Sequence, residues 1–330
     1  MKKIIIVTFY YGCFGKDIEF WFHSVKKNPT IDFLLFTDLE VPAQSANLTI
    51  VHKSFAELVD YTQKKFKFKI CVPEPYKFPD FRPAFGVIFS DYLKEYDFWG
   101  FCDTDLVLGD IRAFMTNSLL EKYDKLLAMG HFTLYKNTPE VNTTYMKCDE
   151  PNYQQVFTFP RNSAFEEYFG TSRYWAKNLP NRVYREIPFD DPDCYQYSFV
   201  PQFRRKEDTG KKNFIYSYEN GKLYRIYEMN GKLHKDETMY VHFQKRKMKI
   251  KTNAQDKFMM IPNAYIPFVE NLDIDQLRSF DVSKKWYLHA YKLQWKRVVN
   301  KWKKIKASFH PSEFGVPVLP ADGINYYKER

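Results

Sequence analysis

The sequence predicts an α/β fold built on a mostly parallel sheet. In the first third of the chain, short apolar runs alternate with longer amphipathic runs, the pattern of strands alternating with helices. The apolar runs lack the every-second-residue alternation of a half-exposed strand, so both faces of the sheet are expected to be covered. The 330 residues, 45% of them hydrophobic, suffice for a full α/β core.

The first elements can be placed in order along the chain. We expect strands at 3–9, 33–37, 48–52 and 98–102, helices at 17–27, 55–66 and 83–93, then a helix at 118–123 and a strand at 126–129. In such sheets ligands bind at the carboxyl ends of the strands. Asp38 and the pair Asp103 and Asp105 follow strand ends directly, so this edge is the expected binding edge.

A second pattern occupies residues 214–243. Asn220-Gly221 and Asn230-Gly231 are signals for type I′ turns between alternating segments. We expect a three-stranded β-meander whose last strand, at 239–243, delivers His242.

The segment Asp103-Thr104-Asp105 is the main chemical signal. Two carboxylates at positions i and i+2 after a buried strand can face one point, and Mg²⁺ or Mn²⁺ commonly joins such carboxylates to substrate phosphates. The cation would neutralise the charge that grows on a diphosphate leaving group. The alternative is a solvated Asp-x-Asp turn without a ligand.

These motifs carry a family resemblance. FCDTDLVLG (101–109) resembles the DxD motif of GT-A glycosyltransferases, and VHFQKR (241–246) resembles the late His motif of GT-A enzymes of the glycogenin/galactosyltransferase-like kind. Together with NPTIDFLLFTD, PYKFPDFRPAFG and GHFTLYKN, they resemble an uncharacterised group of bacterial surface-polysaccharide glycosyltransferases over about residues 1–250. The late motif lacks the Gly and Pro-Trp of the better-known family, so Lys245 and Arg246 match that family's motif less closely than His242 does.

The resemblance implies a GT-A domain, Rossmann-like, with a nucleotide-sugar donor, a UDP-sugar first among them, and Mn²⁺ or Mg²⁺ as cofactor. Asp103, Asp105 and His242 are then the metal ligands. The donor would be held by residues at the strand ends and in the cationic segments: Thr8, Phe9, Tyr10, Asp38, Lys77, Arg82, Asp103, Thr104, Lys245 and Arg246. Core packing is the competing interpretation for Phe9, and surface charge is the competing one for the cations.

Inverting transfer needs a carboxylate within reach of the acceptor hydroxyl. Asp190, Asp191 and Glu166 are the candidates for this base, whereas retaining transfer would need none. His131, which follows the strand after the DxD motif, is the candidate for the acceptor pocket.

We expect a catalytic domain at 1–265 and a helical extension at 266–330. Between Lys284 and Lys306 lie nine cations and no acid, out of a net charge of +10 for the chain. Tyr287, Tyr291, Trp295, Val298, Trp302, Ile305 and Phe309 form a stripe at helical spacing. Such an amphipathic helix at 284–309 fits either an anionic membrane surface, as for a lipid-linked glycan acceptor, or packing on the catalytic domain.

Five widely spaced cysteines without a CxxC pair predict reduced thiols and the cytoplasm, at the inner face of the membrane if the helix binds there. Basic charge confined to one helix argues against a nucleic-acid partner or a lectin-like binding protein.

Two enzyme classes remain as alternatives. A haloacid-dehalogenase-like phosphatase or phosphotransferase would use DxDxV, although its motif usually ends the first strand. A sugar nucleotidyltransferase would need a Gly-rich phosphate loop near the N-terminus, which this sequence lacks.

Overall fold

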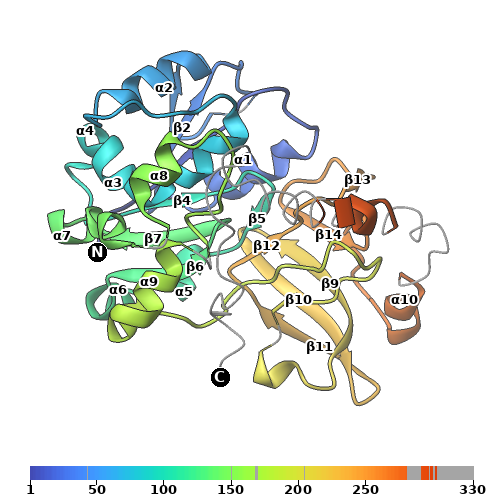
Figure 1. The fold of residues 1–330 in the computed structure, drawn as a ribbon. Coiled ribbons are helices and arrows are strands. Elements are labelled where there is room, and N and C mark those ends of the chain that lie inside the picture. Colours follow the sequence, from blue (N-terminus) through green and yellow to red (C-terminus); the bar gives the residue numbers. More distant parts are fainter. Residues whose placement is uncertain are drawn as a thin grey trace.

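The computed structural model describes residues 1–42, 44–149, 151–167, 170–203, 205–280, 291–296, 298–299 and 302. It contains a seven-stranded sheet, a six-stranded sheet and a two-stranded ribbon. Figure 1 shows helices packed around the first sheet, with the second sheet beside it and the ribbon between them. The predicted mixed α/β class is confirmed.

The first sheet is mostly parallel, as predicted. Its strands are β1 (Ile4–Phe9), β2 (Asp32–Thr37), β3 (Leu48–His52), β4 (Phe98–Cys102), β6 (Lys125–Met129), β7 (Phe132–Lys136) and β8 (Val183–Tyr184). They lie in the order β3-β2-β1-β4-β7-β6-β8, and within this sheet β7 alone is antiparallel to its neighbours. The carboxyl ends of β1, β2 and β4 therefore share one edge with the start of β7.

Helices cover both faces of this sheet. They are α1 (Ile18–Lys26), α2 (Phe55–Gln63), α3 (Phe85–Ile88), α4 (Ser90–Leu93), α5 (Ile111–Phe114), α6 (Asn117–Lys122), α7 (Pro139–Asn142), α8 (Tyr153–Thr158) and α9 (Thr171–Asn178), with 3₁₀ turns η1 (Pro75–Ala84), η2 (Thr144–Lys147), η3 (Pro180–Arg182) and η4 (Lys206–Asp208). Successive β1 residues point to opposite faces. Ile5 and Val7 join the core beneath α2, α3 and α8, and Ile4 and Ile6 join the core beneath α1, α5 and α6. This is why β1 is apolar on both sides.

The helix expected at 83–93 is divided into shorter pieces. Residues 75–84 form η1, and α3 and α4 follow as single turns. Pro79 and Pro83 lie inside η1, and Phe89, which separates α3 from α4, has φ of −100° and ψ of 18°, away from α-helical values. The apolar spacing was therefore a correct guide to burial but not to helix continuity.

The second sheet contains the predicted meander. Its strands are β9 (Lys212–Glu219), β10 (Lys222–Met229), β11 (Lys232–Glu237), β13 (Lys249–Ile250), β14 (Lys257–Ile261) and β15 (Ala264–Pro267), and α10 (Ile274–Ser279) packs against it. The turn residues Asn220 and Gly221 have φ of 51° and 95°, and Asn230 and Gly231 have φ of 53° and 70°. Two successive positive φ values define the type I′ turn, so both turn predictions are confirmed.

The strand that carries His242 does not belong to the meander, contrary to the prediction. The third meander strand is β11, and residues 240–242 form β12, which pairs antiparallel with β5 (Leu106–Leu108). Tyr240 is fully buried in the core of the first sheet. Because this side chain packs there, β12 pairs with β5 and not with β11. His242 pairs in register with Leu106 and so comes level with the loop that follows β4.

The C-terminal prediction is only partly covered by the described residues. Residues 291–296, 298–299 and 302 are helical, and the remainder of 284–309 lies outside the description. In the described part of the chain, no helix combines the length and the apolar character that a bilayer crossing requires. The domain division at residue 265 stays a prediction.

Candidate metal centre

The loop between β4 and β5 carries both aspartates of the DxD motif. The backbone N–H of Asp103 donates to the carbonyl oxygen of His131 at 2.9 Å, which holds the loop against the start of β7. The side chain of Asp103 is 31% exposed and that of Asp105 is 44% exposed, whereas β4 is buried throughout. Both carboxylates can therefore be reached from solvent.

His242 joins these two carboxylates from the end of β12. Its Nε2 lies 3.3 Å from Oδ1 of Asp105. Ligand atoms of Asp103, Asp105 and His242 all lie within 4.8 Å of one another. The chemistry of this donor set, two carboxylates and one imidazole, fits a single divalent cation such as Mg²⁺ or Mn²⁺.

The second nitrogen of His242 faces another carboxylate. Nδ1 lies 3.2 Å from Oδ1 of Asp191. Burial lowers the pKa of His242, but Asp105 and Asp191 outweigh the burial and raise that pKa well above its usual value. A carboxylate behind a metal-binding imidazole fixes the ring orientation and its tautomer.

Asp191 is itself held by Gln244. The side-chain amide nitrogen of Gln244 lies 2.9 Å and 2.8 Å from the two carboxylate oxygens of Asp191, which is 1% exposed. Gln244 has φ of 43°, a left-handed conformation that non-glycine residues rarely adopt. The sequence interpretation gave Gln244 no role, although it stands two residues after His242.

Asp190 points away from the cluster, toward the second sheet. Its Oδ1 lies 3.4 Å from Arg225 Nη1 and 3.9 Å from Arg205 Nη2, and the residue is 1% exposed. Burial raises the pKa of Asp190 against the lowering effect of the two arginines. Asp190 and Asp191 therefore make their contacts inside the protein. Neither carboxylate is placed to reach the hydroxyl of an acceptor.

Arg82 secures the first aspartate. Its guanidinium pairs with Asp103 and donates to the carbonyl oxygen of Gly130. Its carbon Cζ lies 5.0 Å from the ring centre of Phe101, so the cation is held among apolar and aromatic groups. The sequence predicted a diphosphate contact for Arg82; in this arrangement it orients Asp103.

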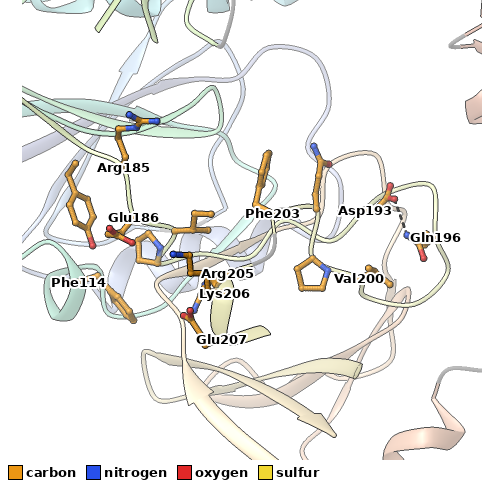
Figure 2. Close-up of a pocket in the computed structure, with 15 residues that line it drawn as sticks. Phe114, Arg185, Glu186, Asp193, Gln196, Val200, Phe203, Arg205, Lys206 and Glu207 are labelled. Atoms are coloured by element: carbon orange, nitrogen blue, oxygen red, sulfur yellow. Dashed lines mark hydrogen bonds between the residues drawn. The ribbon is translucent and has the colours of Figure 1, made fainter. Parts of the chain in front are cut away.

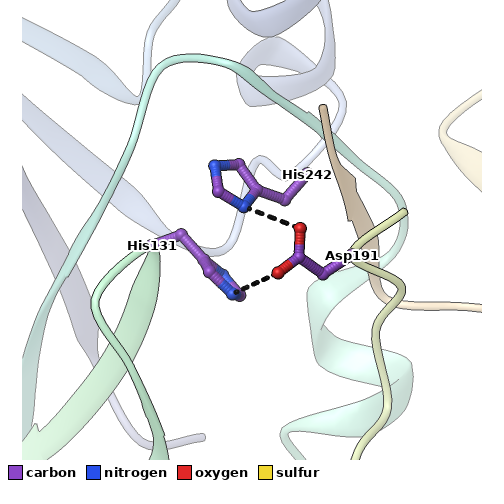
Figure 3. Close-up of side chains that lie close together, drawn as sticks. All are labelled: His131, Asp191 and His242. Carbon is purple, nitrogen blue, oxygen red and sulfur yellow. Dashed lines mark ion pairs between the residues drawn. The ribbon is translucent and has the colours of Figure 1, made fainter. Parts of the chain in front are cut away.

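His131 also lies at the cluster. Its ring centre is 4.4 Å from that of His242, and its Nδ1 is 3.0 Å from the Tyr240 hydroxyl. Burial, together with the neighbouring His242 and Arg82, lowers the pKa of His131 well below its usual value, so the ring is neutral at pH 7. Figure 3 shows the neighbouring rings of His131 and His242, each facing one oxygen of the Asp191 carboxylate.

Residues 6–269 match a family model described as "Family of unknown function (DUF6625)". The chain belongs to the DUF6625 family. The family description names no activity, and no curated protein matches the sequence.

Among the solved structures that this DUF6625 chain matches is the galactosyltransferase LgtC in complex with donor and acceptor sugar analogs. The two share 8% sequence identity over 58% of this chain and 77% of LgtC, with a TM-score of 0.30. A TM-score this low does not establish a common fold.

Two glutamates of the DUF6625 chain lie near the metal cluster. Glu166 is 4% exposed, and burial, followed by Glu167, raises its pKa to about 8. Burial and Asp103 raise the pKa of Glu167. A Cβ added to Gly130 would meet the Glu167 side chain, so this glycine leaves room for the carboxylate in its present position. The sequence interpretation considered Glu166 and Glu167 together as a source of the base and named Glu166 as the candidate.

Two predicted diphosphate ligands serve other purposes. Lys77 is 0% exposed and its ammonium donates to Asp80 and to the carbonyl oxygens of Val156 and Arg161. The guanidinium of Arg246 donates to carbonyl oxygens of the 193–198 segment and to Asn263. Since both cations are engaged inside the protein, we do not assign them to a diphosphate. Lys245 is exposed at the surface.

The residues predicted to hold the nucleotide lie at the ends of β1 and β2. The Thr8 hydroxyl donates to the carbonyl oxygen of Cys102 at 2.8 Å, and Phe9 packs edge-on against Phe78. Tyr10 stacks on Phe14, and Asp38 is exposed. Thr8 and Phe9 thus support the sheet edge, while Tyr10 and Asp38 flank it. Thr104, between the two aspartates, is half-buried.

A cavity of about 1000 Å³ lies along the 184–207 segment (Figure 2). Phe114, Tyr184 and Phe203 supply aromatic surface, and charges of both signs, such as Arg185 and Glu186, line the same space. The backbone N–H of Gln202, in the cavity wall, donates to the carbonyl oxygen of Asp191 at 2.8 Å. One segment therefore connects the cavity to the metal cluster.

Proposed function

We propose that this DUF6625 protein is a metal-dependent glycosyltransferase that transfers a sugar from a nucleotide diphosphate to a glycan. A UDP-sugar is the first donor to test. Following the resemblance of the sequence motifs, the acceptor is a growing bacterial surface glycan such as capsule, O-antigen or lipooligosaccharide.

One observation carries the proposal. Asp103, Asp105 and His242, which are distant in the sequence, present ligand atoms within 4.8 Å of one another at the carboxyl edge of a mostly parallel sheet. Ligands of open α/β sheets bind at this edge. Two half-exposed carboxylates can hold a cation and leave positions for substrate phosphate oxygens.

The bound cation would neutralise the diphosphate leaving group. The chain's own residues set the geometry. Arg82 fixes the carboxylate of Asp103, and Asp191 fixes the imidazole of His242 through Nδ1. Lys245 is the exposed cation nearest in sequence to His242 and is our candidate for the diphosphate, while Tyr10 and Asp38 are our candidates for the nucleotide.

The acceptor is proposed to occupy the cavity along 184–207, with His131 on the metal side. Aromatic faces beside mixed charges suit a hydroxyl-rich sugar, because rings cover the apolar face while polar groups bond the hydroxyls. We infer that Asp190 and Asp191 support the site and do not accept the acceptor's proton. Glu166, 4% exposed, is assigned the same supporting role.

We further propose that the protein acts in the cytoplasm at the inner face of the membrane. The described helical residues 291–296, 298–299 and 302 expose Tyr291, Trp295, Val298 and Trp302, which are spaced for one helical face beside Lys292 and Lys296. An anionic membrane surface would present a lipid-linked acceptor to the enzyme.

The test is thermal unfolding of the purified chain with UDP, with Mn²⁺, and with both, together with slow hydrolysis of a panel of UDP-, GDP- and CDP-sugars. UDP should raise the melting temperature only when Mn²⁺ is present. Asp105→Asn should abolish that increase, because it removes one charged ligand of the cluster.

Asp91→Asn is the matched control, since Asp91 is a surface aspartate that pairs with Lys65. It should leave the nucleotide effect unchanged. Equal stabilisation by UDP with and without Mn²⁺ would contradict the proposal. Metal-dependent release of phosphate from phosphoesters, without sugar-nucleotide hydrolysis, would favour the phosphatase alternative instead.

A further inference from the structure

A second set of possible metal ligands lies behind His242. His131, Asp191 and His242 present ligand atoms within 4.8 Å of one another, and all three residues are buried. Nε2 of His131 lies 3.9 Å from Oδ2 of Asp191, and Nδ1 of His242 lies 3.2 Å from Oδ1 of the same carboxylate. We call these three residues the inner cluster, and Asp103, Asp105 and His242 the outer cluster.

The nitrogen of His131 indicates that the inner cluster can take a ligand. Although His131 is 5% exposed, its Nε2 has no hydrogen-bond partner among the described residues. Burying a polar nitrogen without a hydrogen-bond partner costs free energy, so such an atom indicates a missing ligand. Its Nδ1 can donate to the Tyr240 hydroxyl at 3.0 Å, which leaves the Nε2 lone pair directed toward Asp191.

The inner cluster differs from the outer one in chemistry. It offers two imidazole nitrogens and one carboxylate, a set that Zn²⁺ favours, whereas the outer cluster offers mainly oxygen. Ligand atoms on a tetrahedral zinc lie about 3.3 Å apart, given zinc–ligand bonds of about 2.0 Å. The observed separations of 3.2 Å and 3.9 Å are close to this value. Gln244 holds the same carboxylate through both of its oxygens.

From this geometry we propose that the inner cluster is a zinc site, and that zinc there excludes the cation of the outer cluster. The exclusion of the outer-cluster cation by zinc depends on the proposed function, whereas the zinc site itself does not. A neutral imidazole has one lone pair. A cation at Nε2 of His242 leaves a proton on Nδ1 for Asp191, and zinc at Nδ1 leaves a proton on Nε2 for Asp105. With zinc at Nδ1, the Nε2 of His242 is protonated and cannot bind the cation of the outer cluster. Zinc would therefore inhibit the enzyme.

The zinc site is tested by titrating ZnCl₂ into the metal-stripped full chain by calorimetry. Substituting Co²⁺ and recording its visible absorption reports whether the metal is four-coordinate, as expected for a zinc site, or six-coordinate. His131→Gln, chosen to keep the volume of the buried side chain, should weaken zinc binding about 100-fold or more. Asp103→Asn should leave it unchanged. Circular dichroism of each variant confirms that it is folded, and Asp191→Asn provides a second inner-cluster variant.

Loss of zinc binding in Asp103→Asn but not in His131→Gln or Asp191→Asn would place the zinc in the outer cluster and overturn the proposal.

The exclusion of the outer-cluster cation by zinc is measured by the electron paramagnetic resonance signal of Mn²⁺ bound with UDP. Zinc should release this Mn²⁺ from the wild type, and about 100-fold more zinc should be needed in His131→Gln. Simultaneous binding of both metals would refute the exclusion. If Mn²⁺ with UDP does not bind at all, the proposed function fails while the zinc titration still decides the inner site.

Discussion

The amide of Gln244 lies within hydrogen-bond distance of both carboxylate oxygens of Asp191, at 2.9 Å and 2.8 Å. Gln244 makes this contact from a left-handed backbone with φ of 43°. Strained backbone held in place by its surroundings is typical of functional sites. Through Asp191, the contact also determines where the imidazole of His242 stands.

We therefore expect Gln244→Ala to weaken Mn²⁺ binding by 10–100-fold, the usual effect of losing a partner behind a metal ligand. Gln244→Gly removes the same amide but relieves the left-handed strain, so it should be about 1 kcal/mol more stable than the alanine variant. Calorimetric Mn²⁺ titration and urea unfolding measure the two effects. If both variants bind Mn²⁺ like the wild type, Gln244 does not act on the metal site through Asp191.

The raised pKa of His242 predicts how stability depends on pH in the metal-stripped protein. A histidine whose folded pKa lies above its unfolded value near 6.5 adds stability below that value and loses it as pH rises through the folded pKa. The free energy of unfolding of the wild type should thus exceed that of His242→Gln most at about pH 6, with the difference shrinking at higher pH. Urea unfolding between about pH 6 and 9 tests this, and a difference that grows with pH would contradict it.

Mn²⁺ binding should show the opposite trend, because the cation must displace the proton from Nε2 of His242. Affinity should rise with pH up to the folded pKa of His242. Calorimetry in buffers of different ionisation enthalpy would detect the released proton.

Glu166 offers a separate prediction, because burial raises its pKa to about 8. An acid with a folded pKa above its unfolded value binds its proton more tightly when folded, so it costs stability as pH rises from about 4.5 to 8. Glu166→Gln lacks this cost. Its free energy of unfolding, relative to the wild type, should increase across that range and level off above it.

Donor transfer by Glu166→Gln distinguishes a supporting residue from a base. Loss of a general base typically lowers turnover 10²–10⁴-fold. We expect a decrease of less than about tenfold. A loss in the larger range, with the stability gain still present, would restore Glu166 as the base.

Much of the fold was predictable because burial leaves a clear pattern. The strands β1, β2 and β4 are apolar on both faces, and Asn-Gly at two turns specifies the hairpins. The convergence of Asp103 with Asp105 follows from their position after β4. The approach of His242 was expected from the motif resemblance, but its route through β12 was not, because the burial of Tyr240 is a tertiary effect.

The cations and carboxylates were harder to assign. Sequence shows that Lys77 and Arg246 are charged, but not that each is surrounded by internal acceptors. The same holds for Asp190, whose partner Arg225 comes from the second sheet. Gly130 offered a usable signal for Glu167, since a glycine beside a proposed site often marks a close approach.

The exposed aromatic side chains of the described C-terminal helical residues, Tyr291, Trp295 and Trp302, lead to a prediction about membranes. Trp295 and Trp302 are 59% and 63% exposed, so their replacement should hardly change the melting temperature. Trp295→Ala combined with Trp302→Ala should instead reduce sedimentation with vesicles of phosphatidylcholine and phosphatidylglycerol. Tyr76→Ala, at a 73% exposed aromatic far from this segment in the sequence, is the matched control and should bind vesicles like the wild type.

Charge should contribute to the same binding. Lys292→Glu with Lys296→Glu removes two cations, each worth about 1 kcal/mol at an anionic surface, so affinity should fall at least about 30-fold. The loss should disappear with vesicles of phosphatidylcholine alone and shrink at high salt, because both remove the attraction between the lysines and the surface. Donor hydrolysis in solution should be the same in all of these proteins. Unchanged sedimentation of both double variants would mean that this face does not contact lipid.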